Sequence, residues 1–387
     1  MDCSDDPLSI VRKEGNLMNN SGCTIKVPGK LMIAGEYAVL EPGYKAVVIA
    51  VDRYITSEVR PALRNKLVLS QLGFNDVTWE YSDEEIVFNI QDERLCFIQN
   101  ALKVGYGYLK DINKSPLPFT LSITSDLNDP ETGKKYGLGS SAAIVTSVIA
   151  AFLYIHGEYN SQEDLKKIFK LSAMAHLITQ RNGSGADIAA ACFGGWIQYS
   201  SYSSLWLLNK LSEGHSIKEI HDMSWPNLLV ERMVPPQELQ LVVGWTKESV
   251  GTAPMVKKID EYQKQHRELY KEFLEESYNS VAELICAFEK KEVKKALEAL
   301  QKNRKALLKL SEAAEINIET KKIKTLCSIA DTFGIGKSSG AGGGDCGVAF
   351  VESSLKTVLL KNAWRQAGIE PLSLMVSKEG CSIYNEI

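Results

Sequence analysis

The chain has 387 residues, and because domains usually run to about 100–200 residues, its length indicates two domains and excludes a short peptide module. A hydrophobic content of 44% with 24% charged residues argues against intrinsic disorder. The 44 Lys and Arg against 48 Asp and Glu give a net charge of −4. This charge argues against a nucleic-acid binder held by bulk positive charge but leaves local positive sites open.

The cysteines and the apolar stretches bear on redox chemistry and location. The eight cysteines are scattered, without a Cys-x-x-Cys pair or clustered histidines, so the sequence does not predict a zinc site or a disulfide framework. The first residues are acidic, and no apolar stretch approaches the ~18 residues of a membrane span. We therefore expect a reduced, soluble, cytoplasmic protein, a monomer or homodimer that binds neither nucleic acid nor membrane.

The first half of the chain alternates strand-like and helix-like segments. Residues 1–22 are polar and aperiodic and are expected to form a loose extension. After them, runs of β-branched residues in alternation predict strands, and longer runs with helical periodicity predict helices. We predict strands over 46–59, 119–124 and 194–199 and helices over 94–110, 141–155 and 161–180.

The second half begins after an irregular region that ends in Pro235-Pro236, which indicates a crossover between domains. Residues 255–311 are heavily charged with Leu and Ile at helical spacing, which predicts a long amphipathic helical hairpin. We also predict a strand over 239–245, a helix over 320–333, a glycine-rich loop, a strand over 347–351, a helix over 354–367 and a terminal pair of strands. The predicted division is an extension over 1–22, a first lobe over 23–200, a crossover over 201–238 and a second lobe over 239–387.

The segment Gly-Leu-Gly-Ser-Ser-Ala-Ala at 137–143 lies directly before the apolar helix. Its glycines allow the backbone to approach a ligand, the helix start offers unpaired N–H groups and a positive dipole end, and its serines offer hydroxyls to phosphate or Mg²⁺. A tightly packed helix with a serine cap would also use these residues. A second glycine-rich segment favours the anion-binding interpretation.

That second segment is Lys-Ser-Ser-Gly-Ala-Gly-Gly-Gly-Asp-Cys-Gly at 337–347. A flexible linker is the alternative, but this segment leads directly into an apolar strand, so we interpret it as a wall lined by backbone. It is not a Walker A loop, because Asp331 stands where the first glycine is required.

Two further segments each carry one charged residue. Lys30 lies between Pro28-Gly29 and an apolar stretch, where a surface charge is the alternative interpretation. At 182–187, small residues place Asp187 at the start of an alanine-rich helix, where an acid that pairs with the helix dipole is the alternative.

These segments, in this order, resemble the GHMP family of small-molecule kinases, which groups galactokinase, homoserine kinase, mevalonate kinase and phosphomevalonate kinase. The opening from Pro28 to Leu40, the loop at 137–143 and the loop at 339–347 are three separate matches in the family's order. The resemblance runs from about Lys26 to the end of the chain. It implies an α+β fold of two lobes, the first resembling ribosomal protein S5 domain 2 and the second an α/β sandwich.

Within the family, the sequence resembles the phosphomevalonate kinase branch. Gly-Glu-Tyr-Ala-Val-Leu at 35–40 and Gly-Trp-Thr at 244–246 are similar to that branch, and His176 stands where mevalonate kinases carry a Mg²⁺-binding glutamate. The resemblance implies transfer of phosphate from ATP, with Mg²⁺, to phosphomevalonate. The alternatives are a mevalonate kinase with an altered metal site and a nucleotide-binding sensor without activity, although retention of Lys30 and Asp187 argues against the sensor.

The resemblance also implies roles for individual residues. Lys30 and Asp187 would be catalytic, and Ser141 and Asp187 would hold Mg²⁺. The ATP phosphates would contact Lys135, Gly137, Leu138, Gly139, Ser140, Ser141 and Ala142. The acceptor would contact Lys30, Tyr37, Ser184, Ser249, Thr252, Ser339, Gly340, Ala341 and Gly342. The cations that could offset substrate charge are Lys30, Arg181, Lys247 and Lys337.

Overall fold

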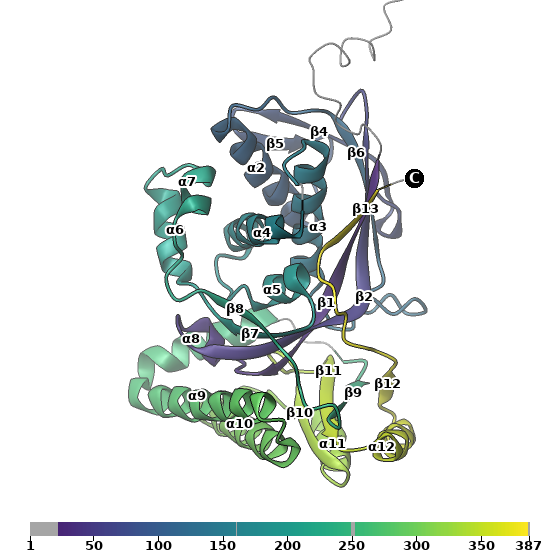
Figure 1. Cartoon of the computed structure of the whole chain (residues 1–387), viewed down its shortest axis with the longest axis vertical. Coiled ribbons are helices and arrows are strands. Elements are labelled where there is room, and N and C mark those ends of the chain that lie inside the picture. Colours follow the sequence, from purple (N-terminus) through teal and green to yellow (C-terminus); the bar gives the residue numbers. More distant parts are fainter. Residues whose placement is uncertain (1–21, 160, 249–251, 386–387) are drawn as a thin grey trace, which may run out of the picture.

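The computed structural model describes residues 22–159, 161–248 and 252–385, so the predicted extension lies almost wholly outside the described residues. Within them the strands form a sheet of nine and a sheet of four, which lie in two lobes stacked along the long axis (Figure 1). No helix in these residues is long and apolar enough to cross a membrane.

The large sheet is organised around the long strand β2, whose first half is buried because its residues are almost all aliphatic. Strand β1 pairs along one edge of β2, while β7 and β6 share the other edge. The order is β13-β1-β2-β6-β3-β4-β5, with β8 added to β7. These strands are β1 (Cys23–Ala34), β2 (Lys45–Pro61), β3 (Lys66–Leu69), β4 (Phe74–Ser82), β5 (Glu85–Phe88), β6 (Phe119–Ser125), β7 (Trp196–Ser200), β8 (Leu229–Met233) and β13 (Ser382–Asn385).

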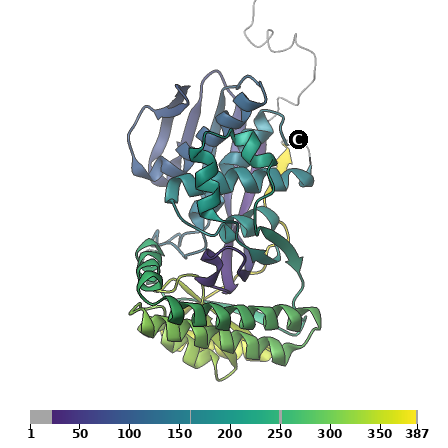
Figure 2. The same ribbon diagram turned by 90° about the vertical axis from the view of Figure 1, so that its left-hand side faces the viewer.

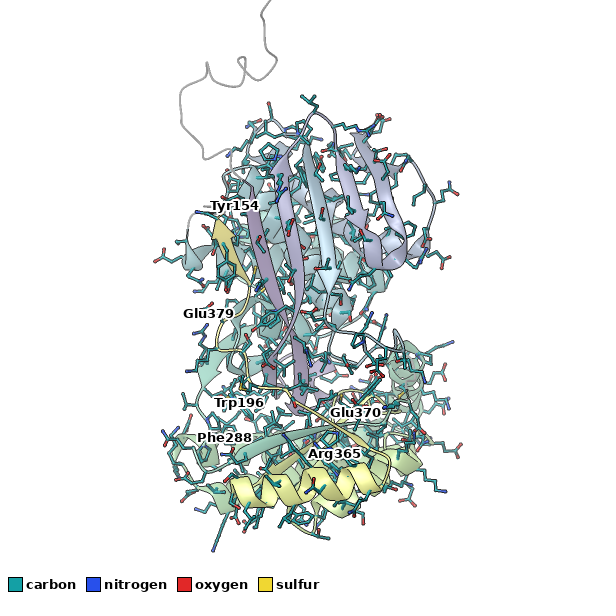
Figure 3. The ribbon with its side chains drawn as sticks, turned by 90° about the vertical axis from the view of Figure 1, so that its right-hand side faces the viewer. Tyr154, Trp196, Phe288, Arg365, Glu370 and Glu379 are labelled. Atoms are coloured by element: carbon teal, nitrogen blue, oxygen red, sulfur yellow. The ribbon has the colours of Figure 1, made fainter. Side chains whose placement is uncertain are left out.

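Helices cover one face of this sheet (Figures 1 and 2), and Figure 3 shows the strands of the opposite face in the upper part of the molecule without a described helix over them. Helix α3 contacts both β1 and β2, and its alanines and serines permit this close approach: Ser57 Oγ of β2 donates to Ser147 Oγ at 2.9 Å. The loop before α3 is thereby held against β1. The helices are α2 (Cys96–Asp111), α3 (Ser140–Ile155), α4 (Leu165–Gln180), α5 (Ala186–Phe193), α6 (Ser204–Ser212) and α7 (Ile217–Asp222).

The second lobe contains the four-stranded sheet β10-β11-β9-β12. The antiparallel helices α9 and α10 run beneath the first lobe (Figure 2), and Trp196 of β7 packs edge-on against Phe288 of α9, with ring centroids 5.4 Å apart (Figure 3). The strands are β9 (Gln240–Trp245), β10 (Gly334–Ser338), β11 (Cys346–Val351) and β12 (Glu370–Leu372). The helices are α8 (Thr252–Gln265), α9 (Arg267–Glu289), α10 (Val293–Ala313), α11 (Lys321–Ala330) and α12 (Ser354–Gln366). Four 3₁₀ turns lie at η1 (Ala38–Leu40), η2 (Ser70–Leu72), η3 (Glu93–Leu95) and η4 (Gln162–Asp164).

Three features of the second half differ from the sequence prediction. The segment predicted as one hairpin contains three helices, α8 to α10. The predicted crossover contains α6, α7 and the strand β8, which joins the large sheet. The last strand, β13, returns from the second lobe to pair with β1 (Figure 1), so the terminal strands belong to different sheets. Pairing partners this distant in sequence leave no local signal.

Candidate active site

The loop at 137–139 is tied to β1 and leads into α3. Gly137 and Gly139 both have positive φ, 81° and 79°, which favours glycine at these positions. Leu138 is buried, and its carbonyl accepts a hydrogen bond of 2.8 Å from Lys30 N. No side chain caps the start of α3. The serine-cap interpretation is therefore wrong, and the first N–H groups of α3 suit an anion.

The side chain of Lys30 runs from this loop to the second glycine-rich segment. A Cβ added at Gly139 would lie 2.9 Å from Lys30 Cγ, and Lys30 Nζ lies 4.0 Å from the position of a Cβ at Gly340. Lys30 is only half-buried. Its ammonium group therefore lies between the two loops, one of which belongs to each lobe.

The second glycine-rich segment is anchored on the first lobe by two side chains. Ser339 Oγ donates to Met32 O at 2.9 Å and accepts from Met32 N at 3.1 Å, and the Tyr37 hydroxyl donates to Ala341 O at 2.5 Å. Burial, followed by the charge of Glu36, raises the pKa of Tyr37, so its hydroxyl stays protonated as a donor. The Ser339 and Tyr37 hydroxyls, predicted to contact the acceptor, hold the loop itself.

Asp345 joins three segments, although the sequence analysis did not single it out. A Cβ at Gly137 would lie 2.5 Å from Asp345 Cβ. The Asp345 carbonyl accepts from Thr246 N at 2.9 Å and from Thr246 Oγ1 at 3.0 Å, and Asp345 N donates to Glu248 O at 2.5 Å. The signal in the sequence that could have marked it is an aspartate within a run of glycines, and its φ of 52° fits such a turn.

The rest of the predicted acceptor loop is only partly described. Ser249 lies outside the described residues, and Thr252 begins α8 without a described side chain. The contacts of Thr246 and Glu248 with Asp345 nevertheless bring this loop next to the loop at 137–139.

Asp187 lies in the first turn of α5, half-buried, and its Oδ1 accepts from Ile188 N at 3.0 Å. Its charge lies near Tyr202, whose pKa is raised first by burial and then by Asp187. The turn before it is fixed by Ser184, whose Oγ accepts from Ala186 N at 3.3 Å and whose carbonyl accepts from the Tyr199 hydroxyl. Because α5 packs against α3 and β1, Asp187 starts a helix beside the one that follows the phosphate loop.

Ser141 and Asp187 fit the ligand chemistry of a magnesium ion that arrives with a nucleotide. Mg²⁺ usually keeps several waters and takes one or two carboxylates together with phosphate oxygens. No cluster of three His, Cys, Asp or Glu side chains that could hold a metal occurs among the described residues. Instead, Ser141 Oγ at the start of α3 lies 3.3 Å from Nε2 of the buried His176.

The other proposed cations differ from Lys30. Lys337 is fully buried against Glu36, so the prediction that it faces substrate is wrong. Lys247 Nζ lies 2.6 Å from the Glu370 carboxylate at the start of β12. Arg181 is an exposed residue at the end of α4, and Lys135 is also exposed. Of the predicted cations, Lys30 is therefore the one whose position between the two loops the contacts define.

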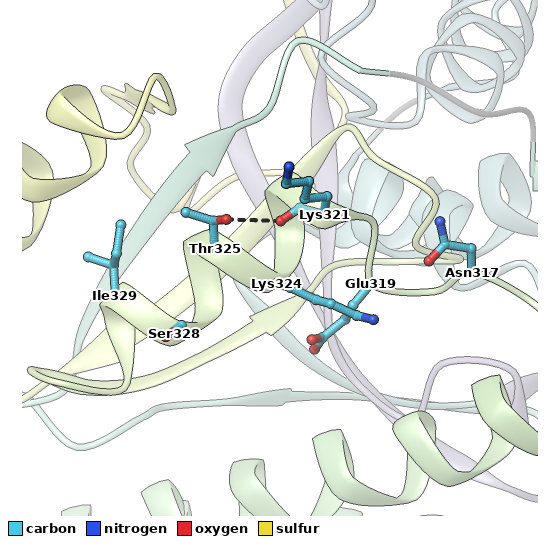
Figure 4. A pocket seen from close by; sticks show the side chains of 7 residues that line it. All are labelled: Asn317, Glu319, Lys321, Lys324, Thr325, Ser328 and Ile329. Carbon is cyan, nitrogen blue, oxygen red and sulfur yellow. Dashed lines mark hydrogen bonds between the residues drawn. The ribbon is translucent and has the colours of Figure 1, made fainter.

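An open hollow of about 610 Å³ lies over α11 (Figure 4). None of the predicted site residues lines it. Its lining consists of Asn317, Glu319, Lys321, Lys324, Thr325, Ser328 and Ile329. The site is thus defined by loop convergence rather than by the size of a cavity.

Replacing Gly139 by Ala should raise the KM for ATP by about tenfold or more. The methyl group would meet Lys30 Cγ at 2.9 Å, and the residue would keep a φ of 79° that alanine disfavours. Steady-state kinetics at varied ATP concentration measures the effect. Gly133→Ala is the matched control, since Gly133 has a φ of 70° but nothing within 4 Å of the added atom. Equal KM values for ATP in the two variants would contradict the assignment of the loop at 137–139 to ATP binding.

Comparisons with known proteins show which family the chain belongs to. The GHMP kinases N terminal domain matches residues 97–195, and the GHMP kinases C terminal domain matches residues 271–370. The phosphomevalonate kinase of Streptomyces sp. (strain CL190) is 32% identical over 367 residues, which cover 91% of this chain and 96% of that protein.

Two solved structures share the whole architecture. A Listeria innocua protein has a TM-score of 0.88 and 34% identity, and the alignment covers 94% of this chain and all of that one. Streptococcus pneumoniae phosphomevalonate kinase, solved in complex with phosphomevalonate and AMPPNP, has a TM-score of 0.79 and 29% identity, and the alignment covers 91% of this chain and 99% of that one. The chain therefore belongs to the GHMP kinase family and groups with its phosphomevalonate kinases.

Proposed function

We propose that this protein transfers the γ-phosphoryl group of ATP to (R)-5-phosphomevalonate, which yields (R)-5-diphosphomevalonate and ADP in the mevalonate route to isoprenoids. The observation that carries the proposal is the position of Lys30, whose side chain lies against Gly139 and whose Nζ lies beside Gly340. Phosphoryl transfer depends on in-line positioning and on neutralisation of charge, and a cation between two glycine-rich loops suits both.

The proposed roles follow from the contacts of each segment. The N–H groups at the start of α3 would bind the ATP phosphates, and the ammonium of Lys30 would offset charge that develops between donor and acceptor. Ser141 and Asp187 would hold Mg²⁺, which, when bound, neutralises phosphate charge. The loop at 339–342 would form the acceptor side, because its anchors leave Gly340 facing Lys30.

His176 favours phosphomevalonate, a phosphate acceptor, over mevalonate, an alcohol acceptor. Mevalonate kinases carry a Mg²⁺-binding glutamate at this position, whereas this chain has an imidazole next to Ser141. The 32% identity with a phosphomevalonate kinase and the likeness to the pneumococcal enzyme solved with phosphomevalonate and AMPPNP support the same choice. The proposal includes a reducing compartment such as the cytoplasm, in keeping with the free thiols of Cys192, Cys327 and Cys346.

A coupled assay of ADP release tests the proposal with Mg·ATP and four acceptors: phosphomevalonate, mevalonate, homoserine and galactose. We expect release with phosphomevalonate only, and its loss when EDTA removes Mg²⁺. Release with mevalonate but not phosphomevalonate would favour the mevalonate kinase alternative. Nucleotide binding in calorimetry without release from any acceptor would favour the sensor.

A further inference from the structure

A buried ion pair joins the two lobes beside the proposed site. Lys337 lies on β10 of the second lobe, and Glu36 lies in the turn after β1 of the first lobe. Lys337 Nζ donates to Glu36 Oε1, and the exposed fractions of the two side chains are 0% and 1%. Lys337 Nζ also donates to Ser338 O at 3.0 Å. The two residues are separated by 301 positions in the sequence, so the contact exists only in the folded protein.

Stability alone does not account for this pair. Taking two charges out of water is costly, and apolar residues of similar volume often serve a core as well or better. The second carboxylate oxygen, Glu36 Oε2, is buried without a hydrogen-bond partner among the described residues. Among the other ion pairs of the described residues, the most buried is Arg304 with Glu319, whose side chains are 17% and 3% exposed.

Apolar packing already holds this part of the interface together. Tyr37 and Ala38, which directly follow Glu36, lie in a buried cluster with side chains of α8, α9 and α10. Apolar contacts are non-directional, however, and do not fix how far one segment lies along another. A charged, hydrogen-bonded pair does fix such a register.

The register matters because of what lies on either side of the pair. The backbone of Met32 is bonded to Ser339 Oγ on one side, and the Tyr37 hydroxyl is bonded to Ala341 O on the other. Gly340 lies between these two anchors, next to Lys30 Nζ. A shift of β10 relative to the turn after β1 would therefore move Gly340 relative to the ammonium group.

We propose that Glu36 and Lys337 form a positioning pair for phosphoryl transfer, which sets the place of the loop at 339–341 over Lys30 without touching either substrate. This inference rests on the proposed function. It predicts a larger effect on the acceptor side than on the nucleotide side, because the loop at 137–139 is also tied to β1, by the bond from Lys30 N to Leu138 O.

The test is a double variant, Glu36→Leu with Lys337→Met, which replaces the pair by apolar side chains and leaves no unpaired charge. We expect a free energy of unfolding in urea equal to that of the wild type. We also expect a kcat lower by about 10- to 100-fold and a raised KM for phosphomevalonate. The KM for ATP should change less than about twofold, since the loop at 137–139 is held by the bond from Lys30 N to Leu138 O and by Asp345, which lies beyond the loop at 339–341. The single variant Glu36→Gln should lose more stability than the double, because it leaves Lys337 buried beside a neutral partner.

The matched control replaces an ion pair far from the loops. Lys114 Nζ lies 2.8 Å from Glu158 Oε1, with side chains 31% and 20% exposed. The double variant Lys114→Met with Glu158→Leu should retain wild-type kcat and both KM values. A Glu36/Lys337 double variant with wild-type kcat and acceptor KM would overturn the positioning role.

Hydrogen–deuterium exchange separates failure of this inference from failure of the proposed function. If wild-type protein releases no ADP with phosphomevalonate, the proposed function fails, but the loop contacts can still be measured. We expect amides at 339–344 to exchange faster in the double variant while those at 137–143 stay unchanged. Unchanged exchange at 339–344 would overturn the positioning role whatever the activity.

Discussion

Replacing Lys30 by Met should lower kcat for ADP release by about 100- to 1,000-fold, the usual loss when a preorganised group that stabilises transition-state charge is removed. The methylene groups of Lys30 pack beside Gly139, and methionine retains most of that bulk while it removes the ammonium beside Gly340. The main loss should therefore appear in kcat, with a smaller change in the KM for ATP.

Lys26 provides the matched control for this prediction. It lies on the same strand, β1, but is exposed, with Nζ 5.9 Å from the centroid of the Tyr384 ring. Lys26→Met should leave kcat unchanged, and both variants should retain the wild-type circular dichroism spectrum and melting temperature within about 3 °C. An unchanged kcat in Lys30→Met would remove Lys30 from the transition state.

The sequence predicted those parts of the site whose chemistry is local. The glycines at 137 and 139, the helix that follows them and the lysine after Pro28-Gly29 are close in sequence to the features that explain them, and the structure brings Lys30 and this loop together. The main strands and helices were predicted for the same reason, since their hydrophobic periodicity is a property of one segment.

The sequence could not predict contacts whose two halves lie far apart. Lys337 is predicted to offset substrate charge because its partner, Glu36, lies 301 positions away in the sequence. No strand is predicted over β10 because Gly-Ile-Gly-Lys-Ser has little strand propensity. The strand forms because β11 provides five residue pairings for it. Pairing with the next strand of the chain therefore overrides local preference at the position that aligns the loop at 339–341.

Replacing Asp187 by Asn should lower kcat by about 100-fold at every pH, and the ratio of wild-type to variant rates should stay constant from about pH 5.5 to 8.5. A phosphate monoester has its second pKa near ~6 and is already largely dianionic at neutral pH, so it needs no base to attack the γ-phosphate. The fall in rate at low pH should then come from protonation of the acceptor and appear in both enzymes. Asp187 would act on Mg²⁺ and on the orientation of Lys30, so the variant should also need more Mg²⁺ for half-maximal rate.

A pH profile distinguishes this role from general base catalysis and from a simple effect on helix α5. If Asp187 removed a proton, the variant would lose only the low-pH limb of the profile and the rate ratio would change with pH. If Asp187 served merely as an acid at a helix start, its replacement would resemble Glu268→Gln, which removes a negative charge from the first turn of α9. We expect that control to change stability by less than about 1 kcal/mol and to leave kcat and the Mg²⁺ requirement at wild-type values. A constant rate ratio combined with a raised Mg²⁺ requirement would therefore identify Asp187 as a group that organises charge around the transferring phosphate.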